Sequence, residues 1–440
     1  VDQIYMEAVM ALTGHGGWPM SVFLTPDLKP FFGGTFFRKD QFLSLLSQIQ
    51  ERWQSQPTSI FQAGEELDLF LKNREEEKTT PKPFDRLFDE AFSQFQQRFD
   101  KTNKGFGGAP KFPQSFNLSF LLKFYQKTKK PEALTMATET LERMAARGLW
   151  DKIGGGFHRY ATQADWNEPH YEKMLYDNAL LAITYLEAYQ VTHQEMFAEI
   201  PRQIFNYVLR EMTDPEGGFY SAQDAGEVGK EGDYYRLNKE ERAQAKPPHK
   251  DDKILTAWNG LMIAAMAKGG KVLGQKEFIE AARKAAMFLL NNLYKNQKLL
   301  RRYREGDGRF SGTIDDYAFF IYGLLDLHEA DPNPEWLETA KRLQEKQDSL
   351  FWDTENSGYY FSEENEEGLI ARKKDFTEGA LPSGNSIAAL NLFKLMGLTG
   401  EEKFKNRLEK LVAVLSVQAS RFPSAFPKAL IVIDSFSKCA

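Results

Sequence analysis

The fold class follows from two stretches, Gly260-Leu-Met-Ile-Ala-Ala-Met-Ala267 and Ala318-Phe-Phe-Ile-Tyr-Gly-Leu-Leu325. Each belongs to a segment long enough for a helix, and each is apolar on every side. A helix that is hydrophobic all round is enclosed by other elements, whereas a helix with one polar face lies at the periphery. From Phe84 onward the chain predicts helices of both kinds in alternation.

The predicted enclosed helices lie near residues 115–127, 171–190, 254–272, 313–329, 384–397 and 425–436. The predicted peripheral helices lie near residues 84–99, 132–149, 196–213, 276–294, 334–350 and 400–419. Equal numbers of both kinds make six helical hairpins closed in a ring. We therefore predict a mostly α-helical (α/α)6 toroid over residues 84–440. The alternative is an open α-solenoid, which needs no enclosed set of helices.

A turn motif recurs after the peripheral helices, in which an aspartate leads into glycine and an aromatic residue. The copies are Asp100 with Gly105-Phe106, Asp151 with Gly154-Gly155-Gly156-Phe157, Asp214 with Gly217-Gly218-Phe219, and Asp353 with Gly358-Tyr359. Repetition of this kind indicates repeated helical hairpins. No Lys-Ser/Thr pair follows the glycines, so we interpret them as conformational and not as phosphate-binding loops.

Residues 1–71 differ from the rest of the chain. They predict a helix over residues 1–12, a buried strand at 20–24, a turn at Thr25-Pro26-Asp27, a second strand at 29–32 and two further helices at 40–52 and 59–72. This small α/β segment opens without an initiator Met and is expected to start inside a domain. Residues 72–83 are charged and lack apolar periodicity, which indicates a linker.

Composition limits the function. Of 440 residues, 56 are Lys or Arg and 62 are Asp or Glu, a net charge of -6 that disfavours a nucleic-acid partner. The longest apolar runs are shorter than the roughly 20 residues that span a bilayer, so no membrane association is expected. The one cysteine, Cys439, leaves no disulfide, cysteine-based zinc site or redox pair within the chain. A cytoplasmic location is expected, with no metal and no cofactor, and the oligomeric state stays open.

Polar residues gather where the predicted enclosed helices begin. Because these helices run in the same direction in a toroid, their N-termini meet at one mouth, where free N–H groups favour oxygen-rich ligands. The candidate catalytic residues are Glu172, Asp177, Asp224 and Asp316. The candidate substrate-binding residues are His158, Arg159, His170, Lys173, Tyr176, Trp258, Asn259, Asp315 and Asn385. Carboxylates beside aromatic rings suit a sugar or polyol.

The preferred pair of catalytic carboxyl groups is Asp177 with Asp224 or Asp316, because acids from different hairpins can flank a substrate. Two carboxyl groups about 5 Å or about 6.5–9.5 Å apart would suit retaining or inverting glycoside hydrolysis. Simpler interpretations stand beside this one. Asp315 and Asp316 would merely cap a helix, Glu172 and Lys173 would form structural ion pairs, and Trp258 would belong to the core.

Several long motifs resemble the spermatogenesis-associated, thioredoxin-like protein family. They are Val1–Met6, Gly14–Leu24, Pro30–Phe36, Gly105–Pro113, Gly154–Tyr160, Pro169–Asn178, Gly217–Asp224, Asp251–Ile263, Asp315–Phe319 and Pro382–Ser386. The resemblance implies a thioredoxin-like domain followed by a six-hairpin toroid like those of glycosidases and N-acylglucosamine 2-epimerases. It also implies that Trp18-Pro19 occupies the cis-proline position of the thioredoxin fold.

The chain departs from that family pattern in three places. The Cys-His-Trp-Cys-type motif is missing, so residues 1–71 are expected to be a redox-inert remnant docked on the toroid or on another chain. Residues 237–246 form a shorter excursion than in the family, so one wall of the mouth is expected to be less complete. The chain also ends soon after the last predicted helix.

Two functions follow as hypotheses. In the first, the toroid binds or processes a carbohydrate, as a glycoside hydrolase or, less favoured, as a sugar epimerase. Epimerisation needs two facing bases, and the only histidines expected at the mouth, His158 and His170, come from one neighbourhood. In the second, the protein is a non-catalytic scaffold, or a thiol-redox or chaperone-type protein in its intact form.

Overall fold

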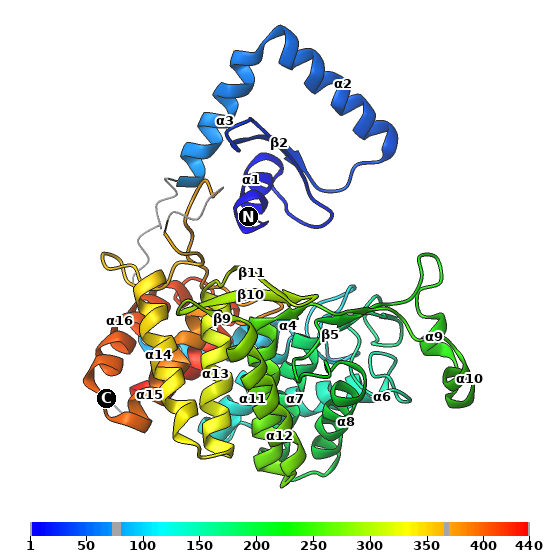
Figure 1. Ribbon diagram of the computed structural model, residues 1–440, viewed down its shortest axis with the longest axis vertical. Helices are drawn as coiled ribbons and strands as arrows, with labels where there is room; N and C mark the ends of the chain where they lie inside the picture. The colour runs from blue at the N-terminus through cyan, green and yellow to red at the C-terminus, as the bar shows by residue number, and fades with distance from the viewer. Residues whose placement is uncertain (1, 73–80, 365–368, 439–440) are drawn as a thin grey trace. The chain divides into compact units, whose positions relative to one another are not determined.

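The computed structural model describes residues 2–72, 81–364 and 369–438 (Figure 1). Contacts divide the chain into two compact units, one within residues 1–78 and 362–374 and the other within 79–361 and 375–440. The first unit thus includes a segment that the sequence analysis assigned to the toroid. The expected linker lies mostly outside the described residues, as does Cys439.

The first unit is a small α/β arrangement. Its elements are α1 (Asp2–Thr13), β1 (Ser21–Leu24), β2 (Pro30–Gly34), α2 (Lys39–Ser55) and α3 (Pro57–Lys72). β1 pairs with β2 in antiparallel fashion, and the Trp18–Pro19 peptide bond is cis, as the family resemblance implied.

Residues 369–374 complete the core of this first unit. Leu369 and Ile370 pack against a buried cluster formed by Ile4, Ala8, Leu67 and Leu71. Lys373 Nζ lies 3.1 Å from Glu7 Oε2 and donates a 2.6 Å hydrogen bond to the carbonyl oxygen of Leu71. Apolar packing and these polar contacts together explain why the segment belongs to this unit.

The second unit is a closed double ring of helices. Its inner helices are α5 (Ser115–Thr128), α7 (Leu175–Thr192), α11 (Thr256–Leu273), α13 (Ile314–Ala330), α15 (Gly384–Thr399) and α17 (Pro427–Ser437). Each contacts the next in this order, and α17 contacts α5. That last contact closes the ring and excludes an open solenoid, so the predicted (α/α)6 toroid is confirmed.

The outer helices are α4 (Phe84–Arg98), α6 (Pro131–Ala146), α8 (Met196–Glu211), α12 (Lys276–Asn292), α14 (Pro334–Phe351) and α16 (Glu402–Ala419). Five of them pack on the inner helix that precedes them in the chain, while α4 packs on both α5 and α17. Each buries a single apolar face, as in Leu87, Phe88, Ala91, Phe92 and Phe95 of α4. In Figure 1 the outer helices α12 and α14 run beside α11 and α13.

Short elements occupy the connections between the helices. They are β3 (Tyr160–Ala161), β4 (Pro169–His170), β5 (Lys173–Met174), β6 (Ala222–Gln223), α9 (Asp233–Arg236), α10 (Lys239–Gln244), β7 (Lys250–Asp251), β8 (Ile254–Leu255), β9 (Tyr294–Lys295), β10 (Lys298–Arg304), β11 (Asp307–Ser311) and the 3₁₀ helix η1 (Pro423–Ala425). β3 pairs with β4, β5 with β6 and β6 with β7, while β10 pairs with β8, β9 and β11.

The aspartate–glycine–aromatic turns share one conformation. In every copy the aspartate Oδ1 accepts a hydrogen bond from the backbone N–H two residues later, at 3.0 Å for Asp100 and 2.9 Å for Asp353. An antiparallel bridge closes each turn, Phe99 with Phe106 in the first copy and Trp352 with Tyr359 in the last. Gly105 and Gly358 have φ of 83° and 82°, a region that favours glycine. The glycines therefore serve the turn.

No helix within the described residues combines the length and the apolar character needed to cross a membrane.

Candidate functional site

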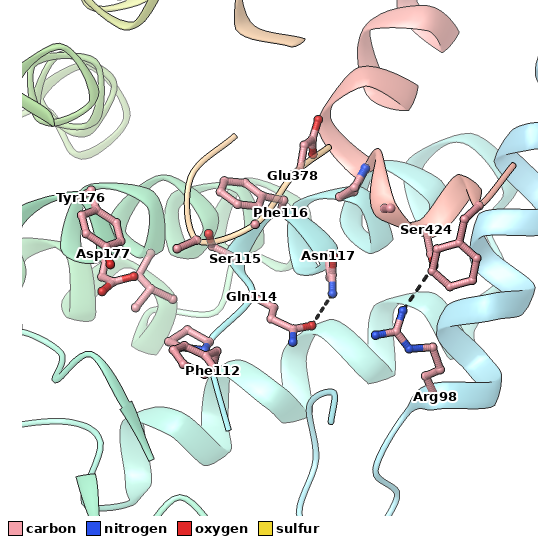
Figure 2. Close-up of a pocket in the computed structure, with 17 residues that line it drawn as sticks. Arg98, Phe112, Gln114, Ser115, Phe116, Asn117, Tyr176, Asp177, Glu378 and Ser424 are labelled. Carbon is pink, nitrogen blue, oxygen red and sulfur yellow. Dashed lines mark hydrogen bonds between the residues drawn. The ribbon is translucent and has the colours of Figure 1, made fainter. Parts of the chain in front are cut away.

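A cavity of about 460 Å³ opens where three inner helices begin (Figure 2). Its walls come from the N-terminal ends of α5, α7 and α17, the C-terminal end of α4 and the loop before α15. The lining residues are Arg98, Phe112, Pro113, Gln114, Ser115, Phe116, Asn117, Tyr176, Asp177, Leu181, Glu378, Gly379, Ala380, Phe422, Ser424, Ala425 and Pro427.

Asp177 is the free acid of this cavity. It lies in the first turn of α7, and its Oδ2 is buried without a hydrogen-bond partner among the described residues. Burial raises the pKa of Asp177 well above its usual range, although the positive charge of Arg159 opposes the shift. Burial therefore disfavours the ionised form of this carboxyl group.

Glu378 is the second carboxyl group on the cavity wall. Its Oε2 accepts a 2.7 Å hydrogen bond from the N–H of Lys428, and its Oε1 accepts a 3.0 Å hydrogen bond from the N–H of Ala429. These are the first free amides of α17, which begins at Pro427, so Glu378 caps that helix from a distant loop. Burial raises the pKa of Glu378 to about 7 despite these bonds.

Two exposed aromatic rings stand on the cavity wall. Phe112 is 40% exposed and Phe422 is 47% exposed. The ring of Phe112 lies 4.8 Å from that of Tyr160, and the guanidinium of Arg98 lies 5.8 Å from the ring of Phe422. Figure 2 shows Phe112 on the side of Asp177 and Arg98 on the side of Ser424.

Two of the predicted site residues, Tyr176 and Asp177, line this cavity. Tyr176 packs edge-on against Trp258, with ring centroids 4.8 Å apart. Burial raises the pKa of the Tyr176 hydroxyl, so it stays a hydrogen-bond donor. Trp258 thus supports the wall from behind Tyr176.

Arg159, His170 and Glu172 form a polar network beside the cavity, and Arg159 interacts with the lining residues Tyr176 and Asp177. Glu172 Oε2 lies 3.0 Å from His170 Nε2 and 3.2 Å from a guanidinium nitrogen of Arg159. The hydrogen bond from His170 lowers the pKa of Glu172, and Arg159 adds to this. Glu172 is therefore an ionised, paired group, which matches the simpler interpretation of an ion pair but with partners other than Lys173.

Asp315 and Asp316 divide their roles at the start of α13. Asp316 Oδ2 accepts from the N–H of Thr313 at 2.8 Å and its Oδ1 from the N–H of Ala257 at 3.1 Å, so Asp316 is a capping residue. Asp315 is half-buried and faces Gly384 at the start of the neighbouring inner helix α15. Burial, with the nearby charges of Asp316 and Asp375, raises the pKa of Asp315 to about 7.

Besides Tyr176 and His158, the structure places three predicted substrate-binding residues in the protein interior. Lys173 is buried, with its Nζ 2.7 Å from Asp151 Oδ2 and 2.6 Å from the carbonyl of Gly155. Arg242 of α10 also binds Asp151 at 2.8 Å, so this ion cluster fixes the turn and the 237–246 excursion. A buried lysine with such partners is not available to a ligand.

Asn259 and Asn385 are the other two, and each clamps a glycine–aromatic turn. Asn259 accepts from the N–H of Phe219 at 2.8 Å and donates to its carbonyl at 2.9 Å. Asn385 makes the same pair of bonds with Tyr359, at 2.8 and 2.9 Å. Asn178 repeats the arrangement on Phe157. Both amides are thereby used by the fold.

His158 and Asp224 also lie away from the main cavity. His158 borders a separate cavity of about 420 Å³; burial and the charge of Lys173 lower its pKa to about 3, so the ring is neutral. The Asp224 side chain is 43% exposed and lies 3.1 Å from His249 Nδ1. Asp224 and Asp316, the preferred partners of Asp177, are not among the residues that line its cavity.

The sequence analysis missed Arg98, Gln114, Glu378 and Ser424. Arg98 ends an outer helix, and Glu378 lies in a loop whose neighbour α17 is about fifty positions later in the chain. No spacing pattern signals a contact of that kind. The clue that was present is Gln114, since a polar residue directly before an enclosed helix marks another helix start at the same mouth.

No group of three or more His, Cys, Asp or Glu residues in the described part of the chain is arranged to hold a metal ion.

The second unit is a six-hairpin (α/α)6 toroid whose fold is similar to those of sugar epimerases and glycoside hydrolases, and a thioredoxin-like domain precedes it. A cellobiose 2-epimerase from Bacillus thermoamylovorans matches with a TM-score of 0.61 at 11% identity, over 81% of this chain and 99% of that one. A GH76 alpha-mannanase from Bacteroides thetaiotaomicron matches with a TM-score of 0.58 at 12% identity, over 81% and 97%.

The particular family is that of spermatogenesis-associated protein 20, to which this chain belongs. The human protein of that name is 33% identical over 543 residues, which cover 97% of this chain and 69% of the human protein. An uncharacterized protein of Caenorhabditis elegans is 29% identical over 98% of this chain and 74% of its own length. Residues 1–72 match the family model Thioredox_DsbH, described as a protein of unknown function, DUF255.

Proposed function

We propose that the toroid binds a carbohydrate in the cavity formed by the N-terminal ends of α5, α7 and α17, and that Asp177 acts on it as a protonated carboxyl group. The observation that carries the proposal is the buried, unpartnered Oδ2 of Asp177 in a cavity of about 460 Å³. A buried polar atom without a partner is costly, and a ligand hydroxyl would satisfy it.

The rest of the cavity wall supports a sugar. Exposed Phe112 and Phe422 offer flat apolar faces for the C–H surface of a pyranose ring. Gln114, Asn117 and Ser424 offer amide and hydroxyl groups to ring hydroxyls. The structurally similar proteins whose names state an activity include a sugar epimerase and a mannanase.

The protonation states favour acid catalysis over histidine-based epimerisation. Asp177 can donate a proton to a leaving or ring oxygen, the role of a general acid. His158 is a neutral buried ring, and neither His158 nor His170 lines the cavity. Glu378 is the other lining carboxyl, and both its oxygens already accept hydrogen bonds from α17.

A direct test measures saccharide binding by thermal shift and calorimetry, across neutral and acidic mono- and disaccharides. Asp177→Leu removes the carboxyl, and we expect binding to weaken about tenfold or more because a buried hydrogen-bonded partner is lost. The control is Asp89→Leu, which removes an exposed aspartate of the outer helix α4. If no saccharide binds the unaltered chain, the carbohydrate proposal fails.

A second assay follows saccharide turnover by product analysis. Asp177→Asn keeps the size of the side chain and removes the acid, so turnover is expected to fall about 10²- to 10⁴-fold. Binding that persists without any turnover in the unaltered chain would favour a binding module. If both assays fail, the alternative hypothesis of a non-catalytic scaffold remains. The match of residues 1–72 to a thioredoxin-type family model supports that hypothesis.

A further inference from the structure

Arg98 is a cation in the cavity without an ionic partner. It is the last residue of α4, and its guanidinium donates a 3.4 Å hydrogen bond to Ser424 Oγ and lies over the Phe422 ring. Within the described residues it forms no ion pair, although Arg86 at the other end of the same helix pairs with Glu90 at 2.9 Å. Ser424 and Phe422 hold the guanidinium at the cavity wall.

The two carboxyl groups of the cavity do not balance this charge. Burial raises the pKa of Asp177 and so disfavours its carboxylate form. Both oxygens of Glu378 accept hydrogen bonds from the first amides of α17. Burial disfavours the ionised form of both acids, and Arg98 forms no ion pair with either of them among the described residues.

The start of α5 adds hydrogen-bond donors on the same wall. Gln114, which precedes the helix, has φ 49° and ψ 52° and makes no side-chain cap. Its Oε1 accepts instead from Asn117 Nδ2 at 2.6 Å, as Figure 2 shows. In the described part of the chain the N–H groups of Ser115 and Phe116, which both line the cavity, are left without an acceptor. A helix start of this kind attracts anions.

A buried lysine lies behind this helix start. Lys428 lines a small void that shares Ser115 and Phe116 with the main cavity. Its ammonium has no hydrogen-bond acceptor among the described residues, and its contact there is the face of Tyr322 at 5.8 Å. Burial lowers the pKa of Lys428, and Glu187 and Glu378 oppose that shift, so the charge at the start of α5 comes from Arg98.

We propose that the ligand is an acidic sugar whose carboxylate or phosphate group lies between the Arg98 guanidinium and the first N–H groups of α5. This inference rests on the proposed carbohydrate function and narrows its substrate class. Guanidinium and helix N–H donors together suit a planar or tetrahedral oxyanion. The unpartnered oxygen of Asp177 in the same cavity marks the space for the hydroxyl-bearing part of the ligand.

The test compares neutral sugars with their acidic counterparts on the whole chain. Glucose, glucuronate and glucose 6-phosphate, together with the matched galactose and mannose series and inorganic phosphate, are titrated by calorimetry. We expect the acidic form of the sugar that binds to bind about tenfold or more tightly than its neutral parent, and less tightly as salt rises. Comparing the uronates with the sugar phosphates shows whether the site binds a carboxylate or a phosphate group.

Arg98→Gln removes the charge and is expected to erase the preference for the acidic form. Arg98→Lys should retain part of it, and Arg86→Gln on the same helix should leave it unchanged. A neutral sugar that binds as tightly as its acidic counterpart, with no effect of Arg98→Gln, overturns this inference and leaves the proposed function standing. Phosphate binding that depends on Arg98 without any sugar binding supports the anion subsite and overturns the carbohydrate function. No binding of any probe overturns both.

Discussion

Asp315 is a single residue whose ionisation should be visible in the stability of the whole toroid. Its pKa is raised from 3.8 to about 7 by burial and by the neighbouring Asp316 and Asp375. A carboxyl group with a higher pKa in the folded state binds its proton more tightly there. Its stabilising contribution is complete below the unfolded pKa and is lost as the pH rises through about 7.

Asp315→Asn should therefore change the pH dependence of unfolding. We expect the Tm of the variant minus that of the unaltered chain to rise by about 2 °C between pH 5 and pH 8, because Asn cannot acquire the buried charge. Circular dichroism melts across this range provide the measurement. Asp89→Asn, an exposed change on α4, should give a difference that is flat with pH; a flat difference for Asp315→Asn would contradict the pKa assignment.

At the residue scale the sequence predicted where polar groups gather but not which of them face a ligand. Common helix direction was enough to place Tyr176 and Asp177 at the mouth. Lys173 and Asn259 lie at equivalent helix starts, yet their side chains turn back to Asp151 and to the Phe219 backbone. These partners are loop atoms, whose positions helical spacing does not predict. A polar residue that faces a ligand and one that holds a loop therefore look alike in the sequence.

At the element scale, the asparagine clamps should be among the most sensitive positions of the toroid. Asn259 makes hydrogen bonds of 2.8 and 2.9 Å to Phe219 and of 3.0 Å to the Leu255 carbonyl, all in the interior. Asn259→Ala leaves these backbone groups unsatisfied, and we expect a loss of about 2 to 4 kcal/mol in the free energy of unfolding.

Chemical denaturation of Asn259→Ala gives this value directly. Asn406→Ala, an exposed change on the outer helix α16, should stay within about 0.5 kcal/mol of the unaltered chain. Comparable losses are expected for Asn178→Ala and Asn385→Ala, since all three clamps have the same geometry. A loss below 1 kcal/mol at all three positions would show that the turns hold without their clamps.

At the scale of the whole molecule, the segment 369–374 should stabilise the first unit rather than the toroid. Ile370 packs on the cluster that contains Ile4 and Leu71. Ile370→Asp places a charge against this cluster, which should cost about 2 kcal/mol or more and open the first unit. Limited trypsin digestion should then cut within residues 2–72 sooner and leave the toroid intact.

Val228→Asp serves as the control, because Val228 is 98% exposed in a loop of the toroid. It should leave the digestion pattern unchanged. Cleavage of the toroid before the first unit in Ile370→Asp would argue against the assignment of this segment.

The ring itself could be predicted because the residues of a helix show whether it is enclosed. α11 and α13 have no polar face, so other helices had to surround them. That residues 362–374 belong to the first unit could not be predicted in this way. Leu369 and Ile370 are only two apolar residues in a polar stretch, and their partners lie some three hundred positions earlier or more near α1 and α3. Pairing over such a distance leaves no periodic signal.

A contact between the first and the last hairpin of the ring has a consequence for how the chain is made. Gln94 of α4 binds the Ser424 N–H at 3.0 Å, across a separation of 330 residues. At about 5 to 20 residues per second, a ribosome needs on the order of 20 to 60 seconds to travel that far. During this interval the apolar faces of α4 and α5 are outside the exit tunnel without α17 to cover them. Slowing translation in the last hundred codons should therefore lengthen the period in which the nascent chain binds chaperones.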